Sequence, residues 1–203
     1  MSAIIKEEEI QEQILQAAKQ LFQLHGFRRV TIDDIARAIG KARSSLYYYY
    51  KTKEEILDAV IVIEIRELMT ALAAAINRAQ NAEEKIKAFF LAKLSAVREK
   101  SGFFNTLDEG MDAKELSSFK KIRLAVHEQI LQQEAALLGQ VIRDGILRKE
   151  LNKLSDQDQE GLIFVLLSSL HGIKREMMLK NDFSKMEPLV HILIRSLFHG
   201  LKE

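Results

Sequence analysis

The sequence predicts an all-α fold with about nine helices. Long stretches of the 203-residue chain carry apolar residues at helical spacing, and no convincing stretch alternates apolar with polar residues as a half-buried strand does. One proline and nine glycines leave few points at which helices must break. The apolar fraction of 47% is ample for a buried core. We expect a compact head of three short helices, residues 1–53, and a larger antiparallel helical body, residues 54–203.

The composition argues against several classes of protein. Lys and Arg number 30 and Asp and Glu number 29, so neither disorder nor a membrane class is indicated. The sequence contains no cysteine, which excludes disulfides, thiolate metal sites and a cysteine nucleophile. The N-terminus lacks a signal-peptide pattern, and even the apolar run from Leu162 to Leu167 is far short of the roughly 18 residues of a membrane span. We therefore expect a soluble, cytoplasmic protein.

The charges are unevenly placed along the chain. Seven Lys and Arg residues and two Asp residues lie between Gly26 and Lys53, a net charge of +5, whereas the whole chain carries +1. A basic segment on an otherwise acidic chain indicates a polyanionic partner. A chance cluster of charges on a solvated face would give the same count.

The first helices have clear boundary signals. One helix is predicted from Ile10 to Gly26, where an apolar stripe ends at a glycine that can adopt the left-handed conformation. Phe27 can then fold back onto Phe22. Three later helices begin at capping patterns, in which an acidic residue follows the capping residue three positions on: Thr31 with Asp34, Thr52 with Glu55, and Asn81 with Glu84.

The helices of the body are less sharply bounded. We expect one from the Asn81 cap to about Lys100, a break at the sequence SGFFNTLDEG, and a long helix from about Glu115 to Arg143. Another is expected from about Gln157 to Lys180. The last is expected from near Pro188 to about Leu201, since proline is tolerated in a first turn.

A tight turn at Gly40 separates the second and third helices, with the small residue Ala36 where the two must approach. Two helices joined in this way have the sequence form of a helix-turn-helix, which places the start of its second helix in the major groove of DNA. The residues at that start are Arg43, Ser44 and Ser45. Arginine can bind guanine with two hydrogen bonds, worth about 1–3 kcal/mol of discrimination, and serine can contact several base edges or phosphates.

All four tyrosines of the chain are consecutive, Tyr47 to Tyr50, on this third helix. Consecutive helical residues point about 100° apart, so the four cannot share one role. We expect Leu46 and Tyr50 to face the core of the head and the other three tyrosines to lie beside the DNA backbone, where a phenol can donate to phosphate. Lys53 adds an ammonium group at the start of the next helix, where the helix dipole favours an anion.

The sequence ILQAAKQLFQLHGFRRVTIDDIARAIGKARSSLYYYYKTKEEIL, residues 14–57, resembles the head of the TetR family of bacterial transcriptional regulators. The resemblance implies a homodimeric, ligand-responsive repressor that binds a near-palindromic double-stranded DNA operator and releases it when a small-molecule effector occupies its body. Thr31, at the start of the second helix, belongs to the predicted DNA-binding set. The other residues in that set are Arg43, Ser44 and Ser45 at bases, and Tyr47, Tyr48, Tyr49 and Lys53 at phosphates.

Three residues depart from the pattern of the family. Ala42 stands where serine or threonine is frequent, so the third helix lacks that N-cap. Tyr49 replaces a frequent histidine, and Tyr50 replaces a frequent phenylalanine whose ring is buried. Tyr50 therefore needs a hydrogen-bond partner or contact with water for its hydroxyl.

Two helices of the body, GLIFVLLSSLHGIKREMM and PLVHILIRSLFHGL, are apolar on almost every side. This pattern predicts burial against the core on one side and against a second subunit on the other. The resemblance pairs these helices with their twins in a four-helix dimer interface, and the alternative is plain core without dimerisation. The predicted interface residues are Leu170, Leu193, Ile194, Leu197 and Phe198.

The predicted effector pocket rests on two features of the body. His127 and His171 lie within otherwise apolar helices and can supply polar contacts, although such a histidine is more often satisfied by its neighbours. The Phe and Met content suggests a small apolar or aromatic effector. The sequence SGFFNTLDEGM interrupts the helical pattern and supplies four apolar residues as a pocket wall: Phe103, Phe104, Leu107 and Met111.

Enzymatic activity is not expected. The sequence HEQIL at His127 lacks the second histidine of a zinc-binding H-E-x-x-H motif, because position 131 is leucine. The sequence has no glycine-rich phosphate loop and no G-x-S-x-G nucleophile elbow. We expect no catalytic residues, no metal site and no cofactor. The alternative to a DNA-binding regulator is a helical adaptor for a protein partner, without operator-specific DNA binding.

Overall fold

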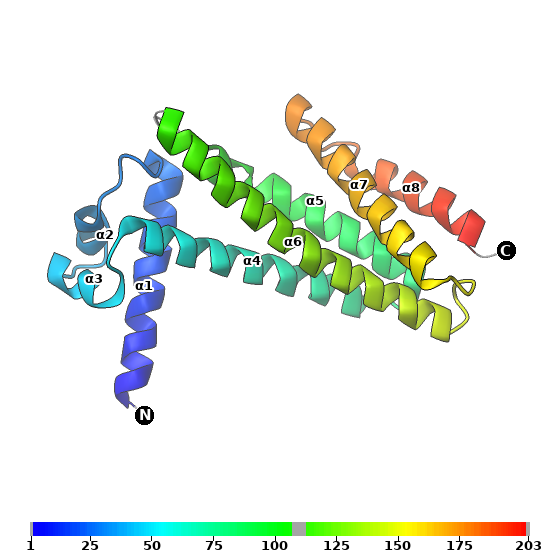
Figure 1. The fold of residues 1–203 in the computed structure, drawn as a ribbon, viewed down its shortest axis with the longest axis horizontal. Helices are drawn as coiled ribbons and strands as arrows, with labels where there is room; N and C mark the ends of the chain where they lie inside the picture. Colours follow the sequence, from blue (N-terminus) through cyan, green and yellow to red (C-terminus); the bar gives the residue numbers. More distant parts are fainter. Residues whose placement is uncertain (1, 107–112, 202–203) are drawn as a thin grey trace. The chain divides into compact units, whose positions relative to one another are not determined.

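The part of the chain that the structure describes forms eight α-helices (Figure 1). The computed structural model describes residues 2–106 and 113–201, and no strand occurs in these two ranges. The predicted all-α fold is confirmed, with eight helices in the described residues where about nine were predicted for the chain. The connection from residue 148 to residue 155 contains turns and bends rather than a helix.

The chain divides into two compact units, which we call the first unit (residues 1–66 and 100–126) and the second unit (residues 67–99 and 127–203). The division falls inside three long helices, α4 (Lys53–Arg78), α5 (Ala82–Thr106) and α6 (Ala113–Leu147). The predicted domain boundary between residues 53 and 54 stays a prediction.

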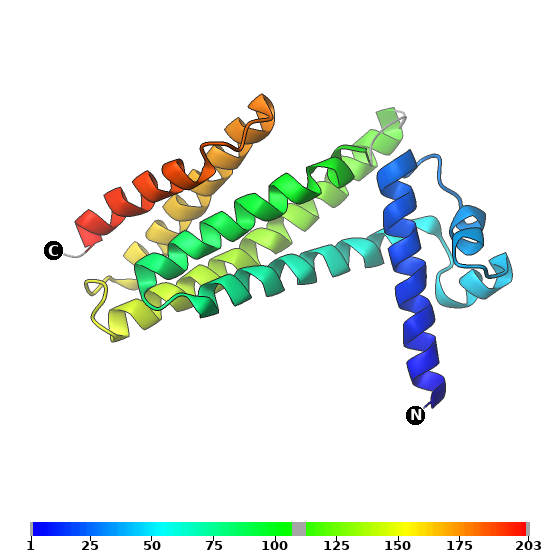
Figure 2. The ribbon, with the colours of Figure 1, turned by 180° about the vertical axis from the view of Figure 1, so that it is seen from behind.

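The first unit begins with α1 (Ser2–His25), α2 (Ile32–Ala38) and α3 (Arg43–Tyr49), which are seen from behind in Figure 2. Helices of seven residues, such as α2 and α3, are too short to be stable alone. Each fully buried Leu, Ile or Phe contributes about 1.5–3 kcal/mol, so both helices depend on the core of this unit. That core includes the fully buried side chains of Ile14, Phe22, Ile35, Leu46 and Ile56.

The end of α1 follows the predicted signal, but its start does not. Gly26 has a φ of 77°, and its N–H donates to the carbonyl oxygen of Phe22 at 2.9 Å. The rings of Phe22 and Phe27 lie 5.3 Å apart, so the predicted contact is confirmed. The helix begins at Ser2 rather than Ile10, because the acidic residues before Ile10 are good helix formers even though they carry no apolar stripe.

Capping side chains start α4 and α5 as predicted. The Thr52 hydroxyl accepts a hydrogen bond from the Glu55 N–H at 3.1 Å, and the side-chain Oδ1 of Asn81 accepts one from the Glu84 N–H at 2.9 Å. In return, each glutamate accepts a hydrogen bond from the N–H one position before the cap, at 2.6 Å in α4 and 3.1 Å in α5.

The predicted break at SGFFNTLDEG is wrong in its first half, since α5 remains helical to Thr106. The sequence contains one glycine in this half, Gly102, and a glycine costs only about 1 kcal/mol in a helix interior. That cost is too small to end a helix that is stabilised elsewhere by packing.

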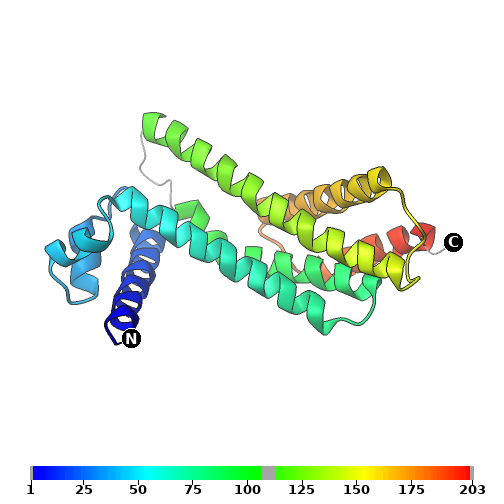
Figure 3. The same cartoon turned by 60° about the horizontal axis from the view of Figure 1, so that its bottom comes forward.

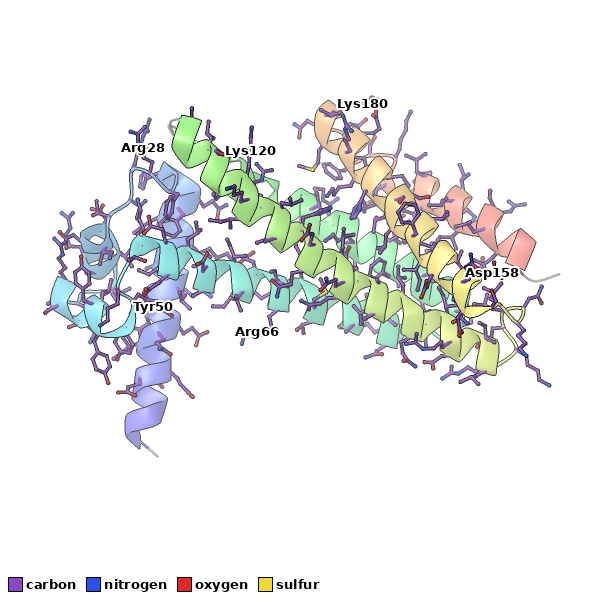
Figure 4. All side chains as sticks on the ribbon, in the orientation of Figure 1. Arg28, Tyr50, Arg66, Lys120, Asp158 and Lys180 are labelled. Carbon is purple, nitrogen blue, oxygen red and sulfur yellow. The ribbon has the colours of Figure 1, made fainter. Side chains whose placement is uncertain are left out.

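The second unit has its own apolar core, to which α7 (Asp156–Lys180) and α8 (Met186–Leu201) contribute. The two helices are joined by a short connection, which can be followed in Figure 3. Ser155 caps α7 by accepting a hydrogen bond from the Asp158 N–H at 3.1 Å, and Asn181 ends it in the left-handed conformation with φ of 46°. Figure 4 labels Asp158 and Lys180 near the two ends of α7.

Gly145 marks a close approach between the end of α6 and the start of α5. A Cβ atom at residue 145 would lie 2.9 Å from the Cβ atom of Ala82 and 3.0 Å from Cδ1 of Leu151. Ala82 is held in place because its N–H donates to Oε2 of Glu150 at 2.6 Å. The two helix ends can therefore meet at this distance only when residue 145 has no side chain.

We predict that Gly145→Ala destabilises the protein. Overpacking costs about 1–3 kcal/mol, whereas replacing glycine by alanine contributes up to about 1 kcal/mol in a helix interior. Urea unfolding should therefore show a free energy of unfolding lower than wild type by up to about 2 kcal/mol. Gln132→Ala, at an exposed position of the same helix, is the control and should stay within about 0.5 kcal/mol. A Gly145→Ala variant that is more stable than wild type would contradict the close approach.

Candidate DNA-binding site

Helix α2, the first helix of the predicted motif, begins at a capping box. The Thr31 hydroxyl accepts a hydrogen bond from the Asp34 N–H at 3.2 Å, and the Thr31 N–H donates to Asp34 Oδ2 at 2.9 Å. Hydrogen bonds from Thr31, and then the charge of Arg37, hold the pKa of Asp34 below its usual value. The predicted cap is confirmed. Thr31 is exposed, and its contact with DNA stays a prediction.

A tight turn at Gly40 joins α2 to α3. Gly40 has a φ of 65°, in the left-handed region where a side chain would be strained. Its N–H donates to the carbonyl oxygen of Arg37 at 3.1 Å, and the Lys41 N–H donates to that of Ala36 at 3.0 Å. Ala36 is buried where the two short helices pack together. The turn therefore fixes the direction in which α3 leaves α2.

Helix α3 begins without a side-chain cap. Ala42 has the extended backbone of an N-cap residue, with φ of −72° and ψ of 148°, but its side chain makes no hydrogen bond to the first turn. The absence of this N-cap, predicted from the sequence, is confirmed. Arg43 and Ser44 are exposed at this end of the helix, and Ser45 is half-buried.

The guanidinium group of Arg43 is held by two oxygen acceptors. Its Nη1 lies 3.2 Å from Oδ2 of Asp33, and its Nη2 donates to the hydroxyl of Tyr47 at 2.8 Å. The group also lies 5.3 Å from the centre of the Tyr47 ring, a cation–π distance. The hydrogen bond to Tyr47, and then the charge of Asp33, raise the pKa of Arg43. Two terminal nitrogens are thus already directed at two acceptors.

Three of the four tyrosines are half-buried, and one is exposed. Leu46 is fully buried, which confirms its predicted place in the core. Tyr50 is only half-buried and forms the C-cap of α3, so its predicted place in the core is not reached. Burial still raises the pKa of Tyr50. Tyr47 and Tyr49 are half-buried, whereas Tyr48 is 69% exposed.

Tyr48 lies beside the start of α1, a contact that sequence reasoning missed. Its hydroxyl lies 3.4 Å from Oε1 of Glu7, a long hydrogen bond, and its ring meets the Tyr49 ring edge-on at 5.0 Å. Burial, and then the charge of Glu7, raise the pKa of Tyr49. The signal for this contact is weak in the sequence because Glu7 precedes the apolar stripe from which α1 was predicted.

Lys53, predicted to contact phosphate, has a structural contact as well. Its Nζ donates to the carbonyl oxygen of Phe27 at 2.8 Å and lies 4.3 Å from the centre of the Phe27 ring. It also lies 3.4 Å from the carbonyl oxygen of Arg28. The ammonium group therefore ties the first turn of α4 to the segment that follows α1. Its contact with DNA stays a prediction.

Exposed basic side chains are distributed over the segment around α3. Figure 4 labels Arg28, in the connection between α1 and α2, and Tyr50, at the end of α3. The segment from Gly26 to Lys53 carries a net charge of +5, and an excess of exposed positive charge suits a polyanion. The exposed cations besides Arg43 are Arg28, Arg29, Arg37, Lys41 and Lys51.

Of the predicted pocket residues, only the two histidines have described side chains. Leu107 and Met111 lie outside the described residues, while Phe103 and Phe104 lie on α5 with side chains outside the description. The two histidines, predicted independently, are brought together: the rings of His127 and His171 lie 5.4 Å apart. Effector binding by these residues stays a prediction.

The predicted interface residues lie on α7 and α8, but most of them face inward. Leu193 and Leu197 are partly buried against the core of the second unit. The large apolar side chains that are exposed on these helices were missed, because a helix that is apolar all round does not indicate which face turns inward. The fully buried residues of the predicted set are Leu170, Ile194 and Phe198.

Residues 14–60 match the family model described as bacterial regulatory proteins, tetR family. This segment contains the helix-turn-helix, the recognition helix α3 and the start of α4. The chain belongs to the TetR family of transcriptional regulators. It is a regulator of transcription and not an enzyme.

Several named relatives of this TetR-family regulator are known. The HTH-type transcriptional repressor KstR2 of Mycolicibacterium smegmatis is 25% identical over 142 residues, which cover 70% of this chain and 69% of the relative. The HTH-type transcriptional regulator LmrA of Bacillus subtilis is 32% identical over 119 residues, which cover 58% of this chain and 63% of that protein.

Solved structures share the fold. The transcriptional regulator FadR of Bacillus subtilis, in complex with stearoyl-CoA, matches with a TM-score of 0.66 at 17% identity, over 94% of this chain and 98% of FadR. A cysteine mutant of the TetR-family regulator CifR, bound to a 26-bp double-strand operator DNA, also matches with a TM-score of 0.66, at 15% identity, over 91% and 94%. At these identities the likeness shows the fold alone.

In the part of the chain that the structure describes, no helix is both long enough and apolar enough to cross a membrane. Residues 2–106 and 113–201 contain no group of three or more His, Asp or Glu residues placed to hold a metal ion.

We predict that Ala42→Ser stabilises this TetR-family regulator. Residue 42 already has the backbone of an N-cap, and a serine hydroxyl there can accept a hydrogen bond from the uncapped first turn of α3. The expected gain is about 1 kcal/mol in the free energy of unfolding, measured with urea.

The reciprocal change, Thr31→Ala, removes the cap of α2 and should cost about 1 kcal/mol. Equal stabilities of wild type and Ala42→Ser, together with a loss in Thr31→Ala, would mean that the start of α3 is not formed as described.

Proposed function

We propose that this TetR-family regulator is a ligand-responsive repressor. In this proposal it binds a near-palindromic operator as a homodimer and releases the DNA when a small molecule occupies the body. Two relatives support parts of the proposal: KstR2 is named a repressor, and FadR is described in complex with stearoyl-CoA.

The proposal depends mainly on the exposed first turn of α3, a helix that is anchored by a buried side chain. Leu46, on the inner face of α3, is fully buried, whereas Arg43 and Ser44 are exposed at the first turn. A helix supported in this way can enter the major groove and direct its N-terminal side chains at base edges. Ser45, half-buried beside them, is the third residue of the proposed base-contacting set.

The contacts of Arg43 suit the reading of a guanine. Its Nη1 is directed at the Asp33 carboxylate and its Nη2 at the Tyr47 hydroxyl. The O6 and N7 atoms of guanine in the major groove form a similar pair of acceptors. We propose that Arg43 exchanges these two protein acceptors for a guanine when DNA binds, so that less side-chain entropy is lost on binding.

We propose that the three tyrosines Tyr47, Tyr48 and Tyr49 contact phosphates. The Tyr49 phenol carries its proton at neutral pH, as tyrosines ordinarily do, and can therefore donate a hydrogen bond. The Tyr48 hydroxyl lies 3.4 Å from Oε1 of Glu7, and we propose that a phosphate oxygen replaces this carboxylate when DNA binds. Tyr47 and Lys53 complete the proposed phosphate-contacting set.

The outer faces of α7 and α8 support a homodimer. In the described residues, six of the eleven exposed large apolar side chains lie on these two helices. On α7, Gly161, Phe164, Val165, Ser168 and Gly172 recur at helical spacing on one face, and a Cβ atom at either glycine would meet no other atom within 4 Å. Small residues beside exposed apolar ones allow the close approach of a partner helix. We propose this face, rather than Leu170, Ile194 and Phe198, as the main interface.

The experiment that tests the proposed function is selection of duplex DNA from a randomised library by the purified protein. Enrichment of a near-palindrome, with half-sites about one helical turn or a multiple of it apart, is the expected result. Weak binding that falls steeply with salt and enriches no sequence would instead favour the adaptor alternative, because phosphate contacts alone carry no sequence preference.

We predict that Arg43→Ala flattens the base preference at one position of each half-site. Loss of a bidentate contact to guanine should reduce discrimination there by about 1–3 kcal/mol, with smaller effects elsewhere. Binding to single-base operator variants measures this change. Arg78→Ala removes an exposed arginine at the end of α4 and should leave the preference unchanged. Equal losses for all operator variants would contradict base reading by Arg43.

We predict that Phe164→Asp converts a dimer into monomers. Phe164 is 72% exposed in a single chain, so the aspartate is tolerated by the monomer but introduces an uncompensated charge into the interface. Light scattering coupled to gel filtration measures the molar mass. Leu147→Asp, at an 80% exposed leucine on α6, is the matched control and should remain dimeric. A Phe164→Asp variant that stays dimeric would place the interface elsewhere.

A further inference from the structure

Five polar side chains from three helices lie together in the second unit. We call them the ionic cluster: Lys93 from α5, His127 and Glu134 from α6, and His171 and Lys174 from α7. The side chain of Glu134 is fully buried, and that of Lys93 is 7% exposed. Burying charged groups is costly, so a cluster of this kind is weak evidence for stability and stronger evidence for a functional site.

The hydrogen bonding of the cluster is incomplete. Lys93 Nζ lies 2.6 Å from Oε1 of Glu134, at ion-pair distance, and His171 Nε2 lies 3.8 Å from Oε2. Neither carboxylate oxygen has a donor in good hydrogen-bonding geometry among the described residues. The deepest polar group of the second unit is therefore held mainly by charge, beside the histidines and lysines that surround it.

The charges of the cluster do not balance. Two ammonium groups, those of Lys93 and Lys174, face one carboxylate, that of Glu134. Lys174 forms no ion pair within 4.0 Å among the described residues. Burial, followed by the charge of Lys93, lowers its pKa, against the opposing charge of Glu134. His171 adds no compensation, because burial, then Lys174, His127 and Lys93 lower its pKa to about 4. The five side chains therefore carry one more positive charge than negative charge.

The cluster reaches the surface. His127 is exposed, and the side chain of His171 is 24% exposed. Their rings lie 5.4 Å apart at one end of the cluster, with Glu134 buried at the other. Apolar residues flank this entry at helical spacing, with Leu131 between the two polar residues of α6 and Leu167 one turn before His171. A ligand can therefore meet both polar and apolar groups here.

We infer that the ionic cluster binds the carboxylate group of an apolar monocarboxylic acid, with the ammonium group of Lys174 as its counter-charge and His171 beside it. This inference rests on the proposed function, since it names the chemical class of the effector. A carboxylate neutralises the remaining positive charge. An amine would add a second unbalanced cation, and an alcohol would leave the existing one in place.

Three probes with one chain and different head groups test the inference: decanoate, 1-decanol and decylamine. Isothermal titration of the full-length protein without DNA gives each dissociation constant. We expect decanoate to bind at least about tenfold more tightly than the other two, the effect of one charge-assisted hydrogen bond.

Two variants locate the carboxylate. Lys174→Met keeps the apolar stem and removes the charge, and it should weaken decanoate binding about tenfold or more while leaving 1-decanol unchanged. Lys153→Met, at an exposed lysine between α6 and α7, is the matched control and should bind decanoate as wild type does. Circular dichroism and urea unfolding confirm that each variant is folded.

Three results would overturn the inference: no binding of decanoate, equal affinities for the three probes, or an unchanged decanoate affinity in Lys174→Met. DNA selection without any probe separates this failure from failure of the proposed function. If operator selection succeeds while decanoate fails, only the effector chemistry is wrong. If decanoate behaves as expected while no operator is enriched, the acid-binding site stands and the repressor proposal fails.

Discussion

The DNA-binding part of this protein depends on the burial of Leu46. Helix α3 has seven residues and no side-chain N-cap, so it cannot hold its conformation alone. Leu46 anchors it in the core of the first unit, while the positive φ of Gly40 sets the direction in which it leaves α2. The position of the exposed side chains of α3 therefore depends on Leu46 and Gly40.

The two units use charge in opposite ways. The first unit keeps its cations at the surface, where they remain solvated and available to an anionic polymer. The second unit buries Lys93 and Glu134 among apolar side chains, with Lys174 close enough to feel both charges. Surface cations attract DNA at little cost to stability. A buried, incompletely paired cluster costs stability in the absence of a ligand, and this cost makes it sensitive to a small charged molecule.

Local features of the fold could be predicted from the sequence, and long-range contacts could not. Gly26, the capping box at Thr31 and the uncapped Ala42 depend on a few neighbouring residues, so their patterns are visible in the chain. The contact of Lys53 with Phe27, and the ion pair of Lys93 with Glu134, join residues far apart in sequence and leave no local pattern. The sequence also does not indicate which face of α7 and α8 turns inward, because both faces are apolar.

The most direct test of DNA reading by α3 is methylation interference on the selected operator. Dimethyl sulfate modifies N7 of guanine in the major groove and N3 of adenine in the minor groove, so it reports which groove the protein enters. We expect methylation of one guanine N7 in each half-site to block binding of the wild-type protein, and we expect Arg43→Ala to lose this sensitivity. Interference from adenine N3 alone would place the contact in the minor groove and contradict base reading by α3 in the major groove.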